Sequence, residues 1–376
     1  MRRVSGMLLI GSAGRNSGKT EFACSLIRKC AARVVGVKVT AIRRKDGACP
    51  RGGKGCGVCT SLEGNFCLTE ETDERSAKDT ARLLAAGADR VFWLRALISH
   101  LTEGTDALLK AVGPGAALIC ESNSLRRAVE PDLFFLVQEK GSREYKDSAR
   151  AVRECADRTV FSDGRQFDFD LDAVRWNGRR WILREHAAAI VLAGGSSRRM
   201  QQDKALLQIG DRPLIQHVCD QLRDHFDEVL VSANDPEKYA FLGVPVIPDR
   251  VPGLGPLMGI ASALEASRHD LNLVVACDIP ELDLSLAHRL LDRAEDSDAV
   301  VPRLNNGRLE PLFAVYRKRA AGRMHGLLAA GERRIRGLFD VCPTRFIDLP
   351  RGRIIKNLNT MEAYVAYVGA KNAALR

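Results

Sequence analysis

The 376-residue chain has no long hydrophobic run and no repeated or low-complexity tract. No stretch of about 18 apolar residues occurs, which argues against a membrane-spanning helix. The apolar run MLLIG near the N-terminus is too short for the core of a signal peptide. An arginine-rich tail, an aromatic-studded basic face and a nucleic-acid-binding motif are also missing. We therefore expect a cytoplasmic protein with no membrane and no nucleic-acid partner.

Size, charge and cysteine content narrow the class further. A chain of 376 residues exceeds what one hydrophobic core usually organises, so two domains are expected. The formal net charge of +10 favours polyanionic ligands such as nucleotides. Eleven cysteines are an odd number, which argues against a simple disulfide framework. These features describe a basic protein that handles phosphorylated small molecules.

Short apolar runs alternate with longer amphipathic ones in both halves, which is typical of βαβ units around a mainly parallel sheet. We predict an α/β fold with one domain at 1–165 and another at 187–376. Between them, at 166–186, Asn177-Gly178 separates two apolar runs, so a hairpin and linker are expected. The expected strands cover 7–11, 33–39, 90–94, 116–121 and 133–137, then a run starting at 187, 228–233, 273–277, 299–302 and 312–316. Helices are expected after Gly18, before Gly113, and over 145–155, 214–225, 256–266, 284–294 and 360–368.

A first phosphate loop, AGRNSGKT, follows the apolar run MLLIG and precedes an amphipathic helix. Its small residues, Gly14 and Gly18 among them, let successive backbone N–H groups surround phosphates. Lys19 would reach the β- and γ-phosphate oxygens and the Thr20 hydroxyl would ligate Mg²⁺. Glu121 ends a later buried strand, where it is either a second magnesium-organising carboxylate or a side chain that faces solvent. The order of strand, loop and helix predicts a P-loop.

Four cysteines lie within a glycine-rich segment: Cys49, Cys56, Cys59 and Cys67. Four thiolates suit either Zn²⁺ or an iron-sulfur cluster, and the spacing does not distinguish the two. Such a loop buries little apolar surface, and a metal would supply the missing folding free energy. The alternative is a set of free or transiently oxidised thiols.

A second phosphate loop, LAGGSSRRMQQDK, follows a β-branched strand in the second half. Its Gly-Gly turn leaves backbone N–H groups at the carboxyl end of the strand, which is the usual ligand side of an α/β sheet. The cations Arg198, Arg199 and Lys204 follow within ten residues of Gly195, a position that favours a triphosphate.

At these residues the second half resembles the molybdenum cofactor guanylyltransferases, whose motif has the form LAGGxSSRMGxDK. Gln201 stands where that family has glycine. Further blocks agree in order and spacing, and the resemblance covers 187–376. These blocks are SANDP, IPDRVPGLGPLMGIASAL, ACDIP, EPLFAVY and NLNTMEAY.

The resemblance implies a Rossmann-like nucleotidyltransferase domain and assigns roles to its residues. Lys204 would bind the nucleotide, together with Leu192, Ala193, Gly194 and Gly195 of the loop. Asn234 and Asp249 would contact guanosine, and Asp278 would hold Mg²⁺. The sequence around Asp278 fits this role, since LVVACD places a carboxylate at the end of a buried strand, although a helix N-cap is an alternative.

The implied reaction is attack by the terminal phosphate of molybdopterin on the α-phosphate of GTP, with pyrophosphate leaving. Such a transfer needs charge neutralisation and in-line positioning more than covalent catalysis. Lys204 and Arg199 would stabilise the developing negative charge. Expected partners are GTP and molybdopterin or the molybdenum cofactor, with molybdoenzymes or their chaperones as further candidates.

The first half resembles the small GTP-binding accessory proteins of the same pathway over residues 6–160. The resemblance is carried by the P-loop, VVGVKVT, LLAAGADRV and LICESNS. It implies a P-loop NTPase-like domain, and the cysteine segment is not part of that family's pattern.

Two other functions remain open. One is transfer of a different nucleotide, such as a cytidylyl group, or transfer to a sugar-phosphate acceptor. The other is a metal- or redox-sensing GTP-binding module that delivers cofactor, with a non-catalytic second half. Intact Lys204, Asp249 and Asp278 argue against the second alternative.

Overall fold

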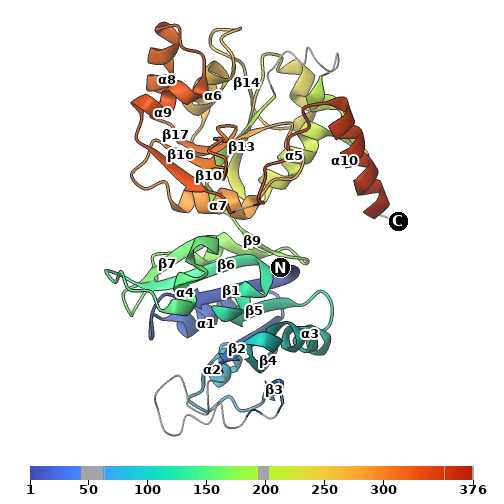
Figure 1. Ribbon diagram of the computed structural model, residues 1–376, viewed down its shortest axis with the longest axis vertical. Coiled ribbons are helices and arrows are strands. Elements are labelled where there is room, and N and C mark those ends of the chain that lie inside the picture. The colour runs from blue at the N-terminus through green and yellow to red at the C-terminus, as the bar shows by residue number, and fades with distance from the viewer. Residues whose placement is uncertain (44–61, 63, 194–202, 351, 375–376) are drawn as a thin grey trace. The chain divides into compact units, whose positions relative to one another are not determined.

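A computed structural model describes residues 1–43, 62, 64–193, 203–350 and 352–374. The chain divides into two compact units, Met1–Leu183 (unit 1) and Arg184–Arg376 (unit 2), each with its own sheet (Figure 1). Cys49, Cys56, Cys59, Gly194, Gly195 and Arg199 lie outside the described residues. In the described part of the chain, no helix is both long and apolar enough to cross a membrane.

Unit 1 is built on a seven-stranded sheet with the order β3-β4-β2-β5-β1-β6-β7. All neighbours pair in parallel except β3 and β4, which are antiparallel. The strands are β1 (Arg2–Ser12), β2 (Val34–Ile42), β3 (Phe66–Glu71), β4 (Arg90–Leu97), β5 (Ala117–Glu121), β6 (Val129–Glu139) and β7 (Arg158–Ser162).

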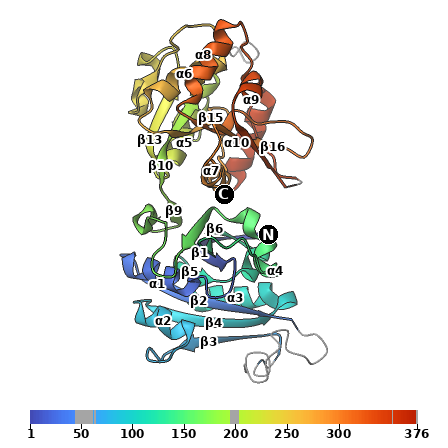
Figure 2. The same ribbon diagram turned by 90° about the vertical axis from the view of Figure 1, so that its left-hand side faces the viewer.

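Helices cover both faces of this sheet (Figure 2). They are α1 (Lys19–Lys29), α2 (Asp79–Ala85), α3 (Leu101–Val112) and α4 (Asp147–Arg150). Successive side chains of a strand point to opposite faces. In β1, Leu8 and Ile10 accordingly join the core under α1 and α2, whereas Met7 and Leu9 join the core under α3 and α4.

The Asn177-Gly178 pair forms the turn of a hairpin, as the sequence predicts. Strands β8 (Val174–Trp176) and β9 (Trp181–Leu183) pair antiparallel, and Asn177 Oδ1 accepts from the backbone N–H groups of Arg179 and Arg180. Trp181 is buried, and its Nε1 donates to the carbonyl oxygens of Gly6 and Leu118. The hairpin is therefore part of the core of unit 1.

Unit 2 is built on a second seven-stranded sheet, with the order β14-β13-β10-β15-β17-β16-β18. Only β17 runs antiparallel to its neighbours. The strands are β10 (Glu185–Leu192), β13 (Phe226–Ser232), β14 (Val246–Ile247), β15 (Leu271–Ala276), β16 (Ala299–Arg303), β17 (Phe313–Arg317) and β18 (Thr344–Asp348), with β11 (Gln208–Ile209) and β12 (Arg212–Pro213) in a separate small ribbon.

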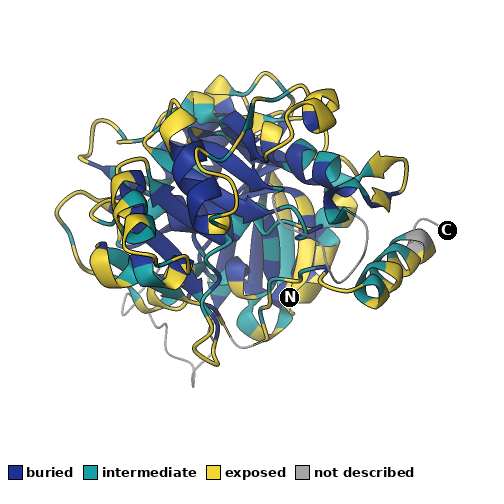
Figure 3. Ribbon diagram, turned by 90° about the horizontal axis from the view of Figure 1, so that it is seen from above, coloured by how far each residue is buried: buried dark blue, intermediate teal, exposed yellow. Residues whose placement is uncertain are grey.

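The helices of unit 2 also lie on both faces of their sheet, and buried residues concentrate in the strands and the inner helix faces (Figure 3). One face carries α5 (Leu214–Arg223), α7 (Leu284–Asp292) and α10 (Met361–Ala374), and the other carries α6 (Pro256–Ala266), α8 (Ala320–Ala329) and α9 (Leu338–Val341). The α/β class with mainly parallel sheets is confirmed.

The sequence-based elements differ from the observed ones mainly at the sheet edges. The strands β3, β7, β14 and β18 were not among those expected, and each lies at or next to an edge, where one-sided burial weakens the apolar pattern. The helix expected over 145–155 is wrong in extent, because only Asp147–Arg150 is α-helical and a short 3-10 turn follows at Arg153–Cys155.

Candidate functional site

In unit 2 the site is built at the carboxyl ends of β10, β13 and β15. Leu192 at the end of β10 pairs with Ser232 on one side and Ala276 on the other. Asn234 and Asp278 each follow two residues after these partners, so parallel pairing brings both to the same edge.

A cavity of about 650 Å³ opens at this edge. Its lining includes most of the residues predicted for the nucleotide that the structure describes: Leu192, Ala193, Lys204, Asn234, Asp249 and Asp278. Residues as far apart in the sequence as Leu192 and Asp278 thus line one cavity, of a size suited to a small organic ligand.

The central charged pair of the cavity is Lys204 and Asp278. Their Nζ and Oδ2 atoms are 3.7 Å apart, and both side chains are largely buried. Burial raises the pKa of Asp278, and the positive charge of Lys204 offsets only part of this. Asp278 Oδ1 is buried and has no hydrogen-bond partner among the described residues. A buried carboxylate oxygen that accepts no hydrogen bond is suited to bind a hard cation, because the cation would compensate for the hydration that the oxygen loses on burial.

Asp203 fixes the turn that carries Lys204. Its side chain accepts from the backbone N–H of Ala205 at 3.0 Å and from the Tyr239 hydroxyl at 2.8 Å, and it forms an ion pair with Lys238. Burial would raise the pKa of Asp203, but the hydrogen bonds from Lys238 and Tyr239 outweigh it and lower the pKa overall. Asp203 is therefore ionised and fully engaged within the fold.

Asn234 and Asp249, which also line the cavity, are hydrogen-bonded to each other. Asn234 Nδ2 donates to Asp249 Oδ2 at 2.9 Å, and the backbone N–H of Asp249 donates to Asn234 Oδ1 at 2.7 Å. Gly259 of α6 packs beside them, where a Cβ atom would lie 2.8 Å from Ser232 Oγ and 3.2 Å from Asp249 Oδ1. Glycine at this helix position allows the close approach.

The C-terminal segment reaches the same cavity. The backbone N–H of Leu358 donates to the carbonyl oxygen of Asp278 at 2.8 Å, and Lys204 Nζ donates to Asn359 Oδ1 at 3.4 Å. Two residues of the NLNT segment are thereby hydrogen-bonded to Asp278 and Lys204.

Unit 1 has its own site at the carboxyl end of β1. Gly18 has a φ of +85°, a left-handed conformation that favours glycine, and α1 begins at Lys19. Because Ile10 of β1 pairs with Glu121 of β5, the Glu121 carboxylate lies beside the loop. Glu121 Oε2 is 3.4 Å from Lys19 Nζ and 3.3 Å from Thr20 Oγ1.

Glu121 is completely buried, and its Oε1 has no hydrogen-bond partner among the described residues. The solvent-facing alternative for this side chain is therefore wrong, because the strand end is covered. The buried carboxylate and the Thr20 hydroxyl provide oxygen ligands of the type that Mg²⁺ prefers.

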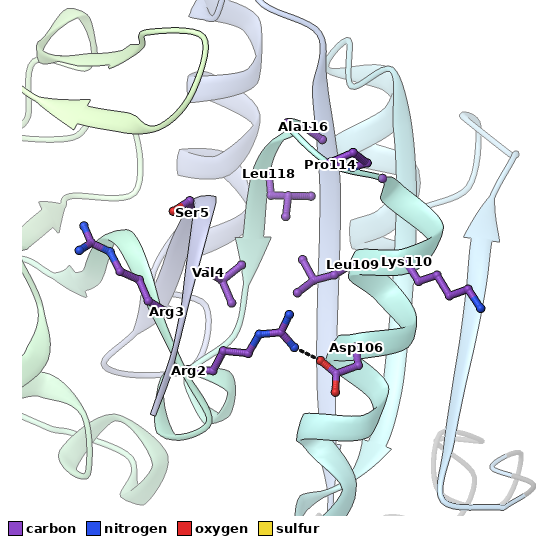
Figure 4. A pocket seen from close by; sticks show the side chains of 12 residues that line it. Arg2, Arg3, Val4, Ser5, Asp106, Leu109, Lys110, Pro114, Ala116 and Leu118 are labelled. Atoms are coloured by element: carbon purple, nitrogen blue, oxygen red, sulfur yellow. Dashed lines mark hydrogen bonds and ion pairs between the residues drawn. The ribbon is translucent and has the colours of Figure 1, made fainter. Parts of the chain in front are cut away.

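A cavity of about 610 Å³ in unit 1 lies at the amino-terminal ends of β1 and β5, at the other end of β1 from Gly18 and Lys19 (Figure 4). Arg2, which lines it, forms an ion pair with Asp106 of α3, and Val4, Leu109 and Leu118 contribute apolar walls. No residue predicted for a site lines this cavity.

Comparison with known proteins gives a family for unit 2. A family model described as a MobA-like NTP transferase domain matches residues 189–344. A probable molybdenum cofactor guanylyltransferase of Pelotomaculum thermopropionicum is 44% identical over 132 residues, which are 35% of this chain and 64% of that relative. The molybdenum cofactor guanylyltransferase of Shewanella putrefaciens is 34% identical over 184 residues, 47% of this chain and 93% of the relative.

The chain belongs to the molybdenum cofactor guanylyltransferase family. It is thus related to nucleotidyltransferases, and the matched segment 189–344 lies within unit 2. A crystal structure of molybdopterin-guanine dinucleotide biosynthesis protein A from Archaeoglobus fulgidus is 22% identical, with a TM-score of 0.43, covering 50% of this chain and 99% of that one.

Several residues that line the cavity or contact its lining in this guanylyltransferase family member were not predicted from the sequence. In the sequence, Asp203 was noted only as part of the Asp-Lys pair of the family motif and was given no role. Gly259 and Asn359 occurred only within blocks that agree with the family, also without a role. Tyr239 had no sequence signal, since its role depends on a contact with a residue 36 positions away.

Proposed function

We propose that unit 2 transfers GMP from GTP to the terminal phosphate of molybdopterin or the molybdenum cofactor. The observation that carries the proposal is the cavity in which Lys204, Asp278, Asn234 and Asp249 meet at one sheet edge. A phosphate oxygen of the acceptor attacks the α-phosphorus of GTP, the bond from that phosphorus to the bridging oxygen breaks, and pyrophosphate leaves.

In this proposal one pair of cavity residues acts on the phosphates and another pair contacts the base. Asp278, with its unpartnered buried Oδ1, would hold Mg²⁺, which neutralises phosphate charge when bound. The Lys204 ammonium would approach the same phosphates and stabilise the charge that develops during transfer. Asn234 and Asp249 would accept hydrogen bonds from the base, and guanine presents an N2 amino donor.

Gly194, Gly195 and Arg199, which are predicted for the phosphate site, lie outside the described residues. Leu192 and Ala193, which lead into them, line the cavity, and the backbone N–H of Ala193 donates to the Ser232 carbonyl oxygen at 3.0 Å. This anchors the start of the loop at the sheet edge.

The reaction is tested by converting Asp278 to Ala in the full-length chain. Dinucleotide formation from GTP, Mg²⁺ and molybdopterin should be lost, while circular dichroism shows a folded protein. Undiminished turnover would overturn the assignment. Pyrophosphate release with GTP, CTP and ATP, each with molybdopterin as acceptor, tests the base, and a preference for CTP would support the cytidylyl alternative.

For unit 1 we propose binding of GTP with Mg²⁺ by the P-loop. The support is local: Gly14 and Gly18 in the loop, Lys19 and Thr20 at the start of α1, and the buried Glu121 within 3.4 Å of both. Equilibrium binding of a fluorescent GTP analogue to the Lys19→Ala variant tests it, and unchanged binding stoichiometry would contradict it.

The cysteine segment is proposed to hold Zn²⁺ or an iron-sulfur cluster. Among its four cysteines only Cys67 is described, at the second position of β3, where Arg95 Nη2 donates to its sulfur at 3.2 Å. Elemental analysis of purified protein, with Cys56→Ser and Cys59→Ser as comparison, tests this proposal.

A further inference from the structure

Outside the two nucleotide sites, two histidines and an aspartate meet on unit 2. His186 lies in β10, Asp227 in β13, and His269 shortly before β15. One potential ligand atom from each residue lies within 4.8 Å of the other two. His186 Nδ1 is 2.7 Å from Asp227 Oδ2, and the rings of His186 and His269 are 4.9 Å apart and nearly perpendicular.

The backbone explains why these side chains meet. Glu185 pairs with Phe226, but the next pair is Ala188 with Glu228, so two residues of β10 face Asp227 alone. Such a bulge redirects a side chain. The three residues lie at the amino-terminal edge of the sheet, whereas Asp278 follows the carboxyl end of β15 at the other edge.

The backbone of His269 is held by its neighbours. Its N–H donates to Ser267 Oγ at 3.1 Å, and its carbonyl oxygen accepts from Asn272 Nδ2 at 3.1 Å. Ser267 and Asn272 are both buried. His269, held by Ser267 and Asn272, and Asp227 in β13 are therefore positioned before a ligand binds, which reduces the ordering cost of binding.

The carboxylate of Asp227 keeps one oxygen for a further ligand. Arg184 Nε donates to Asp227 Oδ1 at 2.8 Å, whereas Asp227 Oδ2 contacts the His186 ring. A cation at Oδ2 would leave the Arg184 hydrogen bond intact as outer-shell support.

We propose that His186, Asp227 and His269 form a binding site for a divalent transition metal ion of the zinc type. Two imidazole nitrogens and one carboxylate oxygen suit Zn²⁺ and its neighbours in the series better than Mg²⁺ or Ca²⁺, which prefer oxygen ligands. Zinc bonds of about 2.0–2.1 Å put ligand atoms roughly 3.3 Å apart. The His186 side chain is 92% exposed and has the freedom to make that adjustment.

This site has a different task from the proposed Mg²⁺ site. The metal would join the first strand of unit 2, two residues after the boundary at Arg184, to β13 and to the turn before β15. Binding only the folded state stabilises it. Zn²⁺ should therefore raise the melting temperature of the protein without being required for nucleotide transfer.

The test uses the full-length chain without an affinity tag, carrying Cys→Ser substitutions at positions 49, 56, 59 and 67 so that thiols do not compete. Titration with Zn²⁺ against a chromophoric chelator should show one site. His186→Asn and His269→Asn should each weaken Zn²⁺ at least about tenfold and abolish the Zn²⁺-induced rise in melting temperature. The matched control is His325→Asn, which removes a histidine paired with Glu265 at 3.0 Å without touching the cluster.

Unchanged Zn²⁺ affinity in both variants, or no Zn²⁺ binding by the parent, would overturn the proposal. If the cysteine-substituted chain fails to fold, the same histidine substitutions are made in the unmodified chain. There the number of bound Zn²⁺ ions should fall by one, and an unchanged number would overturn the proposal equally.

Discussion

Two aspartates of the unit 2 cavity have opposite pKa shifts, although both are neighbours of Lys204. Asp203 precedes Lys204 in the chain, and Asp278 forms an ion pair with it. Asp203 receives hydrogen bonds from Tyr239 and a backbone N–H and an ion pair from Lys238, and its pKa is lowered. Asp278 is more deeply buried, has one oxygen without a donor, and its pKa is raised. The hydrogen bonds of the fold outweigh the burial of Asp203, whereas Lys204 offsets only part of the burial of Asp278.

The shift of Asp278 predicts a pH-dependent stability. A raised pKa means that the folded state binds the proton more tightly than the unfolded state. The free energy of unfolding therefore falls as pH rises from the unfolded-state pKa of the aspartate to its higher folded-state pKa. Without divalent cations, Asp278→Asn should melt at a higher temperature than the parent at pH 7 to 8, and the difference should fade below about pH 4. Melting curves from pH 3.5 to 8 measure this.

Asp203→Asn is the matched comparison and should behave oppositely. Because its pKa is lowered, Asp203 contributes stability above its ordinary pKa, and this is lost as pH falls. The variant should therefore melt below the parent at neutral pH. If Asp278→Asn also melts lower at neutral pH, the attraction to Lys204 outweighs burial and our account of Asp278 is wrong.

Lys204 should matter for the transfer step itself. Its Nζ is the described cation next to Asp278, and removing one group that stabilises developing charge typically slows a reaction by about a hundredfold or more. Lys204→Ala should lower kcat by roughly that factor, measured by pyrophosphate release at saturating GTP. The exposed Lys356→Ala serves as the control, and equal activity of both variants would remove Lys204 from the mechanism.

At the scale of elements, α6 shapes the unit 2 cavity through Gly259, which has no side chain. Gly259 lets the helix approach Ser232 at the end of β13 and Asp249 after β14. A methyl group there would press on Asp249, which exchanges two hydrogen bonds with Asn234. The register of helix against sheet thus sets the geometry of the proposed base contact.

Gly259→Ala should therefore raise KM for GTP several-fold and lower the melting temperature. Gly326→Ala in α8 is the control, because a Cβ at Gly326 meets no atom within 4 Å. Alanine at an interior helix position is favoured over glycine by about 1 kcal/mol, so the control should be slightly stabilised. A Gly259→Ala protein with unchanged KM would show that α6 does not limit nucleotide binding.

At the scale of the whole molecule, the two predicted phosphate loops belong to two separate units. They follow interior strands of their seven-stranded sheets, β1 in unit 1 and β10 in unit 2. Beside each, a neighbouring strand carries a buried or largely buried carboxylate at or just after its end, Glu121 in unit 1 and Asp278 in unit 2. The net charge of +10 suits a chain that would bind two polyphosphates.

We expect the full-length chain to bind two molecules of a fluorescent GTP analogue in the presence of Mg²⁺. Lys19→Ala should remove one of them and leave kcat of GMP transfer unchanged, because its contacts lie within unit 1. Stoichiometric titration and a turnover assay on the same preparation measure both. Loss of transfer in a folded Lys19→Ala protein would instead show that the first nucleotide regulates the second site.

Much of the fold followed from local pattern. Buried strands such as β10 and β15, and helix α6 with both of its bounds, were predicted because apolar runs and their periodicity are read directly from neighbouring residues. Edge strands such as β3 and β18 were not, because their burial is one-sided and depends on which strand lies beside them.

The sequence by itself determined the α/β class, the hairpin turn at Asn177-Gly178, and the residue types of the cavity, since each depends on short stretches of chain or on a family motif. Tertiary structure alone decided that Asp203 is satisfied by Tyr239 and Lys238, that Glu121 is buried beside Lys19, and that His186 meets His269. These contacts depend on strand order and register, which bring together residues far apart in the chain.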